Sequence, residues 1–370
     1  MSGSFTVVQL VPALDAGGVE RATIEIAQAL CREGHRAIVV SAGGRLLPAL
    51  LQTGAQHVQL DIGRKSLWSL RHLPALRRIL RQADVVHARS RFPAWLGWLA
   101  WKTLRKPRPH WVSTVHGLNS VGPYSAVMTR GERVIAVSGT VRDHLVRHYP
   151  KLDPARIRVI PRSFDPEVFA RGHRASSAWR AAFEAEYPRS AGRIWICLPG
   201  RGTRLKGHDE ALQLLAGVRD AGTDACLILL GAGQAGRDAY LDALQAQAGR
   251  LGLAERLVIT PPRADVPDVM SQCALVLQLS NKPEAFGRTV IEALQLGVPV
   301  LGWAHGGVGE LLRELYPPGA VTLGDRDALL ARALTLLHDA PRPAPFQHYR
   351  LEQMQAATLA LYREVIGIPA

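Results

Sequence analysis

The chain alternates short apolar runs with longer segments in which apolar residues recur every three or four positions. In the first half the apolar runs are rich in β-branched residues and are bounded by turn residues. These runs are TVVQLV, HRAIVVSAG, DVVHARS, HWVSTVHG, RVIAVSG and IRVIPRS. Amphipathic stretches such as VERATIEIAQALCREG and SLRHLPALRRILRQ separate some of them. Apolar strands that alternate with helices predict a parallel sheet covered on both faces.

A second series of the same kind follows a polar gap. Residues 165–193 are rich in Arg and Ala and carry no strand signal. After this gap come the runs RIWICLPG, ACLILLGAG, LVITPP, ALVLQLS and VPVLGWA, and the segment LEQMQAATLALYREVIG predicts one more helix near the end. The pattern therefore predicts two doubly wound α/β domains with a boundary near residue 165.

Length and composition agree with two packed domains. The 370 residues are 47% hydrophobic and 21% charged, as in a well-packed globular protein. The four cysteines are scattered without a C-x-x-C pair, which indicates reduced thiols and neither disulfides nor a zinc site. The first residues lead directly into a strand, and no apolar run reaches about 18 residues without charges, so we expect neither a signal peptide nor a membrane span. We expect a cytoplasmic protein.

The net charge of +14 is concentrated in one segment. Between Arg64 and Trp111 the sequence has twelve Lys or Arg residues and one acid, Asp84. Such a concentration favours a polyanionic partner, which is a nucleic acid, an anionic membrane surface or a phosphorylated substrate. A solvated basic face is the alternative.

Two glycine-bearing loops are candidate anion sites. In DAGGVER, Gly17 and Gly18 precede a predicted helix, where glycines let the backbone approach an anion. In PGRGTRLKGHDEAL, Arg201 and Lys206 stand five residues apart before another helix, an arrangement that suits a diphosphate. The order of the G-x-x-x-x-G-K-[ST] motif is absent, which argues against a P-loop ATPase.

A pair of glutamates flanks the start of a third helix. The strand ALVLQLS and the helix RTVIEALQLG are joined by NKPEAFG, so Glu284 precedes the helix and Glu292 lies one turn inside it. The amides from Gly287 to Thr289 would be available for a phosphate. We interpret the two carboxylates as acceptors for hydroxyls of one elongated ligand, with the sugar at one and the ribose at the other. For Glu292 alone, an ordinary glutamate on a helix surface is the alternative.

The motif PEAFGRTVIEALQLGVPV followed by GGVGE resembles the signature of the family-4 retaining glycosyltransferases with the GT-B fold. GGVER, TVHG, VIAVS, VIP and GRGTRLKG extend the likeness over nearly the whole chain. The resemblance implies two Rossmann-like domains that face each other across a cleft, with the last helix returning to the first domain. The expected domains are residues 1–165 with 350–370, which bind the acceptor, and residues 166–349, which bind the nucleotide-sugar. It also implies a retaining transfer from a nucleotide-sugar, expected to be UDP-linked, without a metal or other cofactor.

The resemblance assigns a role to each candidate residue. Glu284 would bind the donor-sugar hydroxyls near the reacting carbon, and Glu292 the ribose hydroxyls. Arg201 and Lys206 would hold the diphosphate and stabilise the charge that develops on it. His116 of TVHG would lie near the sugar, with a core histidine as the alternative. The remaining donor-binding positions implied by the resemblance are Gly17, Gly18, Arg263, Phe286, Gly287, Arg288 and Thr289.

One departure from the family pattern follows VIP. Arg162 and Ser163 stand where the family often has Asn-Gly. This puts the local turn in doubt and is expected to leave the donor site untouched.

The acceptor should be bound by the basic N-terminal domain. Trp95, Trp98, Trp101 and Trp111 lie among Arg and Lys residues, a combination that suits the headgroup zone of an anionic membrane, although core packing is the alternative for any one of them. The chain resembles bacterial enzymes that build the lipopolysaccharide core, which implies a phosphorylated, lipid-linked oligosaccharide on the cytoplasmic leaflet of the inner membrane. Lys102, Arg105 and Lys106 are the predicted membrane contacts.

Other classes of protein explain less of the sequence. A nucleic-acid-binding protein would account for the charge but not for the two predicted sheets with their paired glutamates, so no nucleic acid is expected as a partner. A nucleotide-sugar epimerase of GT-B architecture is the main alternative enzyme and would need no acceptor. A phosphorylase would need a lysine-bound pyridoxal phosphate.

Overall fold

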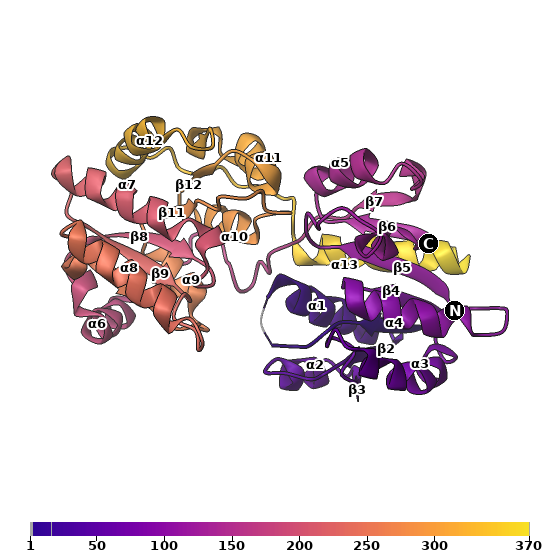
Figure 1. Ribbon diagram of the computed structural model, residues 1–370. Helices are drawn as coiled ribbons and strands as arrows, with labels where there is room; N and C mark the ends of the chain where they lie inside the picture. Colours follow the sequence, from indigo (N-terminus) through magenta and orange to yellow (C-terminus); the bar gives the residue numbers. More distant parts are fainter. Residues whose placement is uncertain (1–2, 16, 370) are drawn as a thin grey trace. The chain divides into compact units, whose positions relative to one another are not determined.

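The computed structural model describes residues 3–15 and 17–369, and the chain divides into two compact units. The N-terminal unit comprises Met1–Ser163 and Leu351–Ala370, and the C-terminal unit comprises Phe164–Arg350. In Figure 1 the first unit runs from indigo to magenta and includes the yellow helix at the end of the chain.

Described residues of the N-terminal unit form a seven-stranded parallel sheet in the order β3-β2-β1-β4-β5-β6-β7. Its strands are β1 (Thr6–Leu10), β2 (Arg36–Ser41), β3 (Gln56–Gln59), β4 (Val85–Ala88), β5 (His110–Val115), β6 (Arg133–Ala136) and β7 (Ile157–Val159). The connecting helices are α1 (Gly18–Arg32), α2 (Leu47–Gln52), η1 (Leu67–His72), α3 (Leu73–Leu80), α4 (Arg91–Lys102), η2 (Ser125–Thr129), α5 (Gly139–His148) and η3 (Pro154–Arg156).

The last helix of the chain, α13 (Leu351–Ile366), packs in the core of this same unit. Tyr362 is fully buried there, and Gln355 Nε2 donates a 2.8 Å hydrogen bond to the backbone carbonyl of Glu25 in α1. The α1 side chains of Ile26 and Leu30, one turn apart, are buried in the same core. The spacing of apolar residues in both helices thus serves to cover the sheet.

In the C-terminal unit the described residues form a six-stranded parallel sheet, ordered β10-β9-β8-β11-β12-β13. Its strands are β8 (Ile194–Pro199), β9 (Ala225–Leu230), β10 (Leu257–Ile259), β11 (Leu275–Gln278), β12 (Val300–Trp303) and β13 (Ala320–Val321). The helices are α6 (Ser177–Glu186), η4 (Pro188–Ser190), η5 (Arg204–Lys206), α7 (His208–Asp220), α8 (Asp238–Arg250), η6 (Ala254–Arg256), α9 (Val266–Ser271), α10 (Arg288–Leu296), α11 (Gly306–Leu315), η7 (Pro317–Gly319) and α12 (Arg326–His338).

The strand order reverses once in each sheet. In the N-terminal unit β1 pairs with β4, where Val8 lies opposite Val86, and in the C-terminal unit β8 pairs with β11, where Cys197 lies opposite Val276. At such a reversal the loops after the two strands leave in opposite directions, which opens a crevice outside their carboxyl ends. The predicted loops of Gly18, Lys206 and Glu284 follow strands at these points.

The predicted fold class, two doubly wound parallel domains, is confirmed, and each strand predicted from an apolar run is present. Two strands were not predicted. β3 reads QHVQ and is only half-buried, and β13 has two residues, so neither gives an apolar run. The polar gap at residues 165–193 contains the helix α6 and no named strand.

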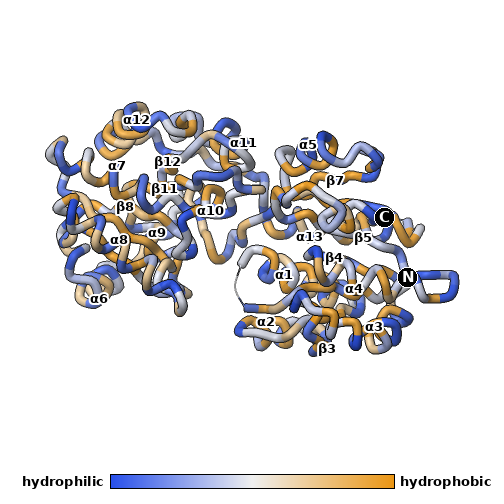
Figure 2. Tube along the Cα trace, in the orientation of Figure 1, coloured by the Kyte–Doolittle hydropathy of each residue, from blue (hydrophilic) through white to orange (hydrophobic). Residues whose placement is uncertain are grey.

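Figure 2 shows that the helices carry both hydrophobic and hydrophilic residues, as expected for helices that cover a sheet on one side. Within the described part of the chain, no helix is both long enough and apolar enough to cross a membrane.

Candidate functional site

Three loops of the C-terminal unit meet where its strand order reverses. They follow β8, β11 and β12, and hydrogen bonds join the first two, since the Asn281 amide donates to the Leu205 carbonyl at 3.0 Å. Gly207 has a φ of 73°, and a Cβ there would lie 1.9 Å from the carbonyl oxygen of Leu279. Only glycine fits this position, so the loop of Arg201 and Lys206 is held directly against the end of β11.

Lys206 and Glu284 form the centre of this site. Lys206 Nζ lies 2.7 Å from Glu284 Oε1, and Ser280 Oγ donates a hydrogen bond to the same oxygen. The two side chains are 21% and 25% exposed, so both remain open to a ligand. The stem of Lys206 passes over Gly200, where a Cβ would lie 3.0 Å from Lys206 Cε. A cation and an acceptor are thereby presented side by side.

Two helices begin beside Glu284. Helix α10 starts after Gly287, which has a φ of 108° and offers no side-chain cap, and helix α11 starts at Gly306. The Gly307 amide donates to the Glu284 carbonyl at 2.8 Å, which fixes the second helix start against the glutamate loop. First-turn amides lack partners within their own helix, so the N-terminus of an uncapped helix such as α10 favours an anion.

Glu292 is buried, with 4% of its surface exposed, so the alternative of a glutamate on a helix surface is wrong. Arg288 Nε donates to Glu292 Oε1 at 3.1 Å across one turn of α10. Thr289 Oγ1 accepts a 2.7 Å hydrogen bond from Gln278 Nε2 at the end of β11. Three predicted donor-binding residues, Arg288, Thr289 and Glu292, thus lie in the first turns of α10.

The remaining predicted residues of this unit have different surroundings. Arg201 is exposed in the loop after β8. Phe286 is buried and packs edge-on against Tyr349, with ring centroids 5.6 Å apart. Arg263 lies 2.8 Å from Asp265 and 3.0 Å from Glu186, and the hydrogen bonds that it donates to these carboxylates raise the pKa of its guanidinium. The charge of Arg263 is thus balanced within the unit.

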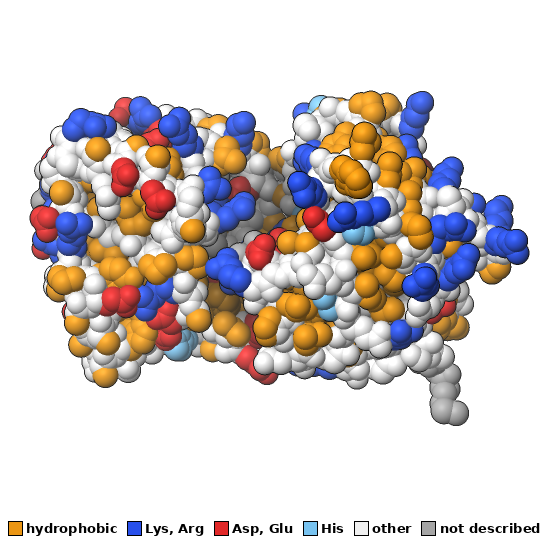
Figure 3. Space-filling view, turned by 60° about the horizontal axis from the view of Figure 1, so that its bottom comes forward, with side chains coloured by type: hydrophobic (Ala, Val, Ile, Leu, Met, Phe, Trp, Pro, Cys, Tyr) orange, Lys and Arg blue, Asp and Glu red, His pale blue; other side chains and the backbone are white. Residues whose placement is uncertain are grey.

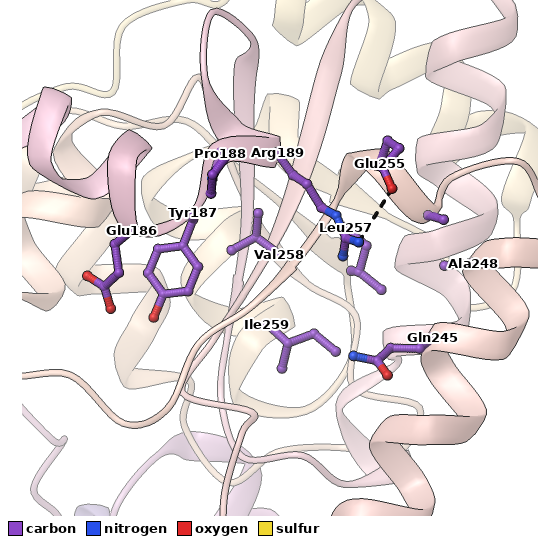
Figure 4. Close-up of a pocket in the computed structure, with 11 residues that line it drawn as sticks. Glu186, Tyr187, Pro188, Arg189, Gln245, Ala248, Glu255, Leu257, Val258 and Ile259 are labelled. Carbon is purple, nitrogen blue, oxygen red and sulfur yellow. Dashed lines mark hydrogen bonds and ion pairs between the residues drawn. The ribbon is translucent and has the colours of Figure 1, made fainter.

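The C-terminal unit also has a cavity of about 570 Å³ away from these loops. Figure 4 shows it between η4, α8 and the edge strand β10, with Tyr187 and Ile259 in its wall and an ion pair of 3.4 Å between Arg189 and Glu255. Neither Lys206 nor Glu284 lines it.

In the N-terminal unit, Arg162 joins two predicted residues. A Cβ on Gly18 would lie 1.7 Å from Arg162 Nη1, so the guanidinium rests against the start of α1. Arg162 Nη2 lies 3.1 Å from His116 Nδ1. The expectation that the departure after VIP leaves the predicted donor residues untouched is therefore wrong. The visible signal was the change from Asn-Gly to Arg-Ser, but the sequence does not show where the long side chain reaches.

The contact with Arg162 determines the state of His116. A guanidinium only donates, so Nδ1 accepts and the ring proton of the neutral imidazole lies on Nε2. Burial, and then the charge of Arg162, hold the pKa of His116 well below its ordinary value. Both ring nitrogens are thus assigned, with Nε2 as a donor.

A buried polar network that the sequence did not predict lies beneath His116. Arg89 Nε donates to Gln9 Oε1 at 2.6 Å, and His87 contacts both Tyr362 of α13 and Thr114 of β5. Arg89 and His116 line a cavity of about 20 Å³, a volume that fits one water molecule. This network ties the last helix to the strands that carry the site.

Three tryptophans of the basic segment, Trp98, Trp101 and Trp111, pack on one another. The Trp95 indole instead donates a 2.8 Å hydrogen bond to the Tyr124 carbonyl. Trp111 is buried in β5, Trp98 stacks on Trp101 with centroids 4.7 Å apart, and Trp98 meets Trp111 edge-on at 5.3 Å. Core packing therefore accounts for Trp111 and for much of the other two. The predicted membrane contacts Lys102, Arg105 and Lys106 precede β5, at the amino ends of the strands, which is the edge opposite His116.

Residues 3–15 and 17–369 contain no group of three or more His, Cys, Asp or Glu side chains that could hold a metal ion.

Comparisons with known proteins find family-model matches in both halves of the chain. Residues 16–168 match the family model Glycosyltransferase Family 4, and residues 180–352 match Glycosyl transferases group 1. A D-inositol 3-phosphate glycosyltransferase of Rhodococcus jostii is 28% identical over 276 residues, which are 70% of this chain but only 59% of the relative. The match thus spans about three fifths of the relative's length.

Solved structures show the same fold over nearly all of the chain. A glycosyltransferase from Rickettsia africae has a TM-score of 0.83 and 25% identity, and the match covers 98% of this chain and 99% of that one. HepE of Anabaena, in complex with UDP and glucose, has a TM-score of 0.79 and 21% identity, with coverage of 97% and 100%. The two halves of the chain thus match these two glycosyltransferase family models, one each, and the chain has the GT-B glycosyltransferase fold.

Proposed function

We propose that this protein is a glycosyltransferase that moves a hexose or N-acetylhexosamine from a UDP-linked donor to a phosphorylated, lipid-linked oligosaccharide, such as the lipopolysaccharide core. Transfer retains the anomeric configuration and needs no metal. The observation that carries the proposal is the contact of Lys206 with Glu284 beside the starts of α10 and α11. The family matches on both halves of the chain support the reaction class.

The diphosphate of the donor would lie against Lys206 and the first amides of α10. The leaving group gains negative charge as the glycosidic bond breaks, and a cation that is already in place stabilises this charge without reorganisation. Arg201, exposed in the same loop, supplies a second cation with two parallel donors. These groups take the part that a divalent ion would otherwise play.

The two glutamates would hold the two ends of the donor. Glu284 accepts hydrogen bonds from hydroxyls of the transferred sugar, and Glu292 accepts from the ribose. The hydrogen bond from Arg288 supports this assignment, because it holds the Glu292 carboxylate at a fixed position one turn inside α10. His116 would donate through Nε2–H to the sugar.

The acceptor is proposed from the charge of the N-terminal unit. The twelve cations between Arg64 and Trp111 suit a phosphorylated acceptor on an anionic, cytoplasmic membrane surface. The name of the Rhodococcus relative favours a second candidate, a small phosphorylated polyol in solution. Both acceptors share a phosphate, so the basic charge alone does not separate them.

The test is a product assay with purified protein and a panel of UDP-sugars. We expect a glycoside in the donor's anomeric configuration with a lipid-linked phosphorylated oligosaccharide, and unchanged turnover in EDTA. Product with inositol phosphate alone would replace the lipid-linked acceptor by the soluble one. Epimerised sugar formed without acceptor would instead identify a nucleotide-sugar epimerase. Inhibition by EDTA that a divalent ion reverses would overturn the metal-free mechanism.

A further inference from the structure

The two most exposed large hydrophobic side chains among the described residues are neighbours in the chain. Leu67 is 85% exposed and Trp68 is 77% exposed, and Leu70 in the same turn is 43% exposed. All three belong to η1, the short helix between β3 and α3. A Trp beside a Leu in water is costly, since burying either would gain about 1.5 to 3 kcal/mol. Their exposure therefore needs a reason.

The turn that presents them is well ordered. Ser66 Oγ accepts a 3.3 Å hydrogen bond from the Trp68 amide, and Ser69, which is buried, donates at 2.7 Å to the Arg64 carbonyl. The inward position is thus filled by a small polar residue, while the apolar side chains point outward. This is the reverse of what packing of the unit would favour.

Cations surround the apolar residues. Lys65 Nζ lies 5.3 Å from the ring centre of Tyr124, and the Arg91 guanidinium lies at the same distance from that ring. Tyr124 and Val121, which is 53% exposed, belong to the loop that follows His116. Arg64, Lys65 and Arg71 are exposed, and they take part in no ion pair within residues 3–15 and 17–369. We call Leu67, Trp68, Leu70, Val121 and Tyr124, with these cations, the η1 patch.

The η1 patch lies at the catalytic edge of the sheet. Segment 60–72 follows β3 and segment 117–124 follows β5, and in a parallel sheet all carboxyl ends share one edge. That edge carries His116 and Arg162. Figure 3 shows Lys and Arg side chains gathered beside hydrophobic ones on the face of the N-terminal unit turned to the viewer.

We propose that the η1 patch inserts Leu67 and Trp68 into the headgroup region of an anionic bilayer. Indole and leucine side chains enter the boundary between headgroups and acyl chains, while neighbouring cations bind anionic lipid. This membrane contact does not require Lys102, Arg105 and Lys106, which lie at the opposite edge of the sheet. The inference builds on the proposed lipid-linked acceptor, because it explains how the catalytic edge reaches such a substrate, but membrane binding is measured without any reaction.

The experiment measures flotation of the full-length protein with vesicles of phosphatidylglycerol and phosphatidylethanolamine, or of phosphatidylcholine alone. Wild type should bind the anionic vesicles, and less so as salt rises. The double variant Leu67→Glu/Trp68→Glu should lose at least about ten-fold in partition coefficient, in line with losing one buried apolar side chain. The matched control Val168→Glu/Leu323→Glu adds the same two charges at exposed positions of the C-terminal unit and should bind like wild type.

Two further measurements separate insertion from simple charge attraction. Brominated lipid should quench tryptophan fluorescence in wild type, and Trp68→Phe should lose most of that quenching while it still binds. The variant Lys102→Gln/Arg105→Gln/Lys106→Gln should keep quenching and bind within a few-fold of wild type. Unchanged binding by the Leu67/Trp68 variant, or loss of binding only in the triple variant, would overturn the proposal.

The outcome is distinct from that of the product assay. Vesicle binding through Trp68 without any glycosyl transfer would leave the membrane contact standing and reject the proposed function. Transfer to a soluble acceptor with no vesicle binding would reject the membrane contact and the lipid-linked acceptor, and would leave only the glycosyltransferase activity standing. Binding of UDP by each variant, measured by calorimetry, controls for the fold.

Discussion

Lys206 and Glu284 are 78 residues apart in the chain, and their charged groups are 2.7 Å apart at the carboxyl edge of the C-terminal sheet. Partly exposed ion pairs contribute little to stability, typically about 0 to 1 kcal/mol. The pair therefore contributes little to folding stability, and we assign it to ligand binding. Changes to either residue should affect ligands more than the fold.

Lys206→Ala should lower turnover by roughly a few hundred-fold, the scale of losing one preorganised group that stabilises a transition-state charge. The thermal midpoint should change little. Lys282→Ala is the matched control, since Lys282 is exposed in the neighbouring loop after β11. Steady-state kinetics with saturating donor and acceptor measure the effect. An equal loss of turnover in both variants would mean that general loop charge, and not the contact with Glu284, is responsible.

Substitutions of the two glutamates should weaken the binding of different ligands. Glu284→Ala should weaken binding of the nucleotide-sugar and spare free UDP, because Glu284 is assigned to the sugar. Glu292→Ala should weaken both, because ribose is common to them. Titration calorimetry of each Ala variant with UDP and with the UDP-sugar gives the four dissociation constants that are needed. Glu292→Gln controls for packing, as it fills the same buried volume beside Arg288. If both Ala variants lose the same affinity for free UDP, this division of roles is rejected.

Arg162→Leu should raise the pKa of His116. It should also allow the proton of the neutral ring to lie on either nitrogen. The nearby cation lowers that pKa, and its removal leaves burial, the larger cause, in place. The pKa should therefore rise yet stay below the ordinary value of about 6.5. An NMR titration of labelled histidine measures it. Arg158→Leu in β7 is the matched control, because Arg158 lies 3.3 Å from Glu364 and does not contact His116. Turnover should fall only in the Arg162 variant, and identical His116 titrations in the two would contradict the assigned contact.

The parts of the fold that were predicted are those that the local pattern determines. Each apolar, β-branched run became a strand, because residues covered on both faces of a sheet leave a continuous apolar signal. β3 was missed because an edge strand with half-buried polar residues resembles a loop in sequence. The helix start at Gly287 was predicted from glycine after a buried strand, and this depends on neighbouring residues alone.

Contacts between distant residues were not predictable in the same way. The burial of Glu292 follows from packing of α10 among other elements, and the reach of Arg162 to Gly18 depends on the sheet order, which places the ends of β1, β5 and β7 at one edge. Trp98, Trp101 and Trp111 pack on one another, a contact that their spacing in the sequence does not show. Trp68, with no comparable cluster around it, is the one that the fold exposes.

A last prediction concerns acid stability. His208, at the start of α7, is completely buried, and its Nδ1 lies 3.0 Å from the Tyr240 hydroxyl. Burial, and then the charge of Lys206, lower the pKa of His208 to about 4. In the unfolded chain the value is about 6.5. As the pH falls from about 6.5 to 4, the unfolded chain takes up the proton first, so stability decreases by up to about 3 kcal/mol from this residue.

His208→Gln should remove this share of the pH dependence, because an amide can still bond to Tyr240 but does not titrate. Urea unfolding of the full chain at pH 7, 5.5 and 4.5 should show a shallower loss of stability than in wild type. The dependence will not vanish, since burial also lowers the pKa of His87 and of His116, and both act in the same direction. His338→Gln, at an exposed position in α12, should follow the wild-type curve. Parallel curves for the His208 variant and wild type would show that the pKa of His208 is not lowered in the folded protein, contrary to its surroundings.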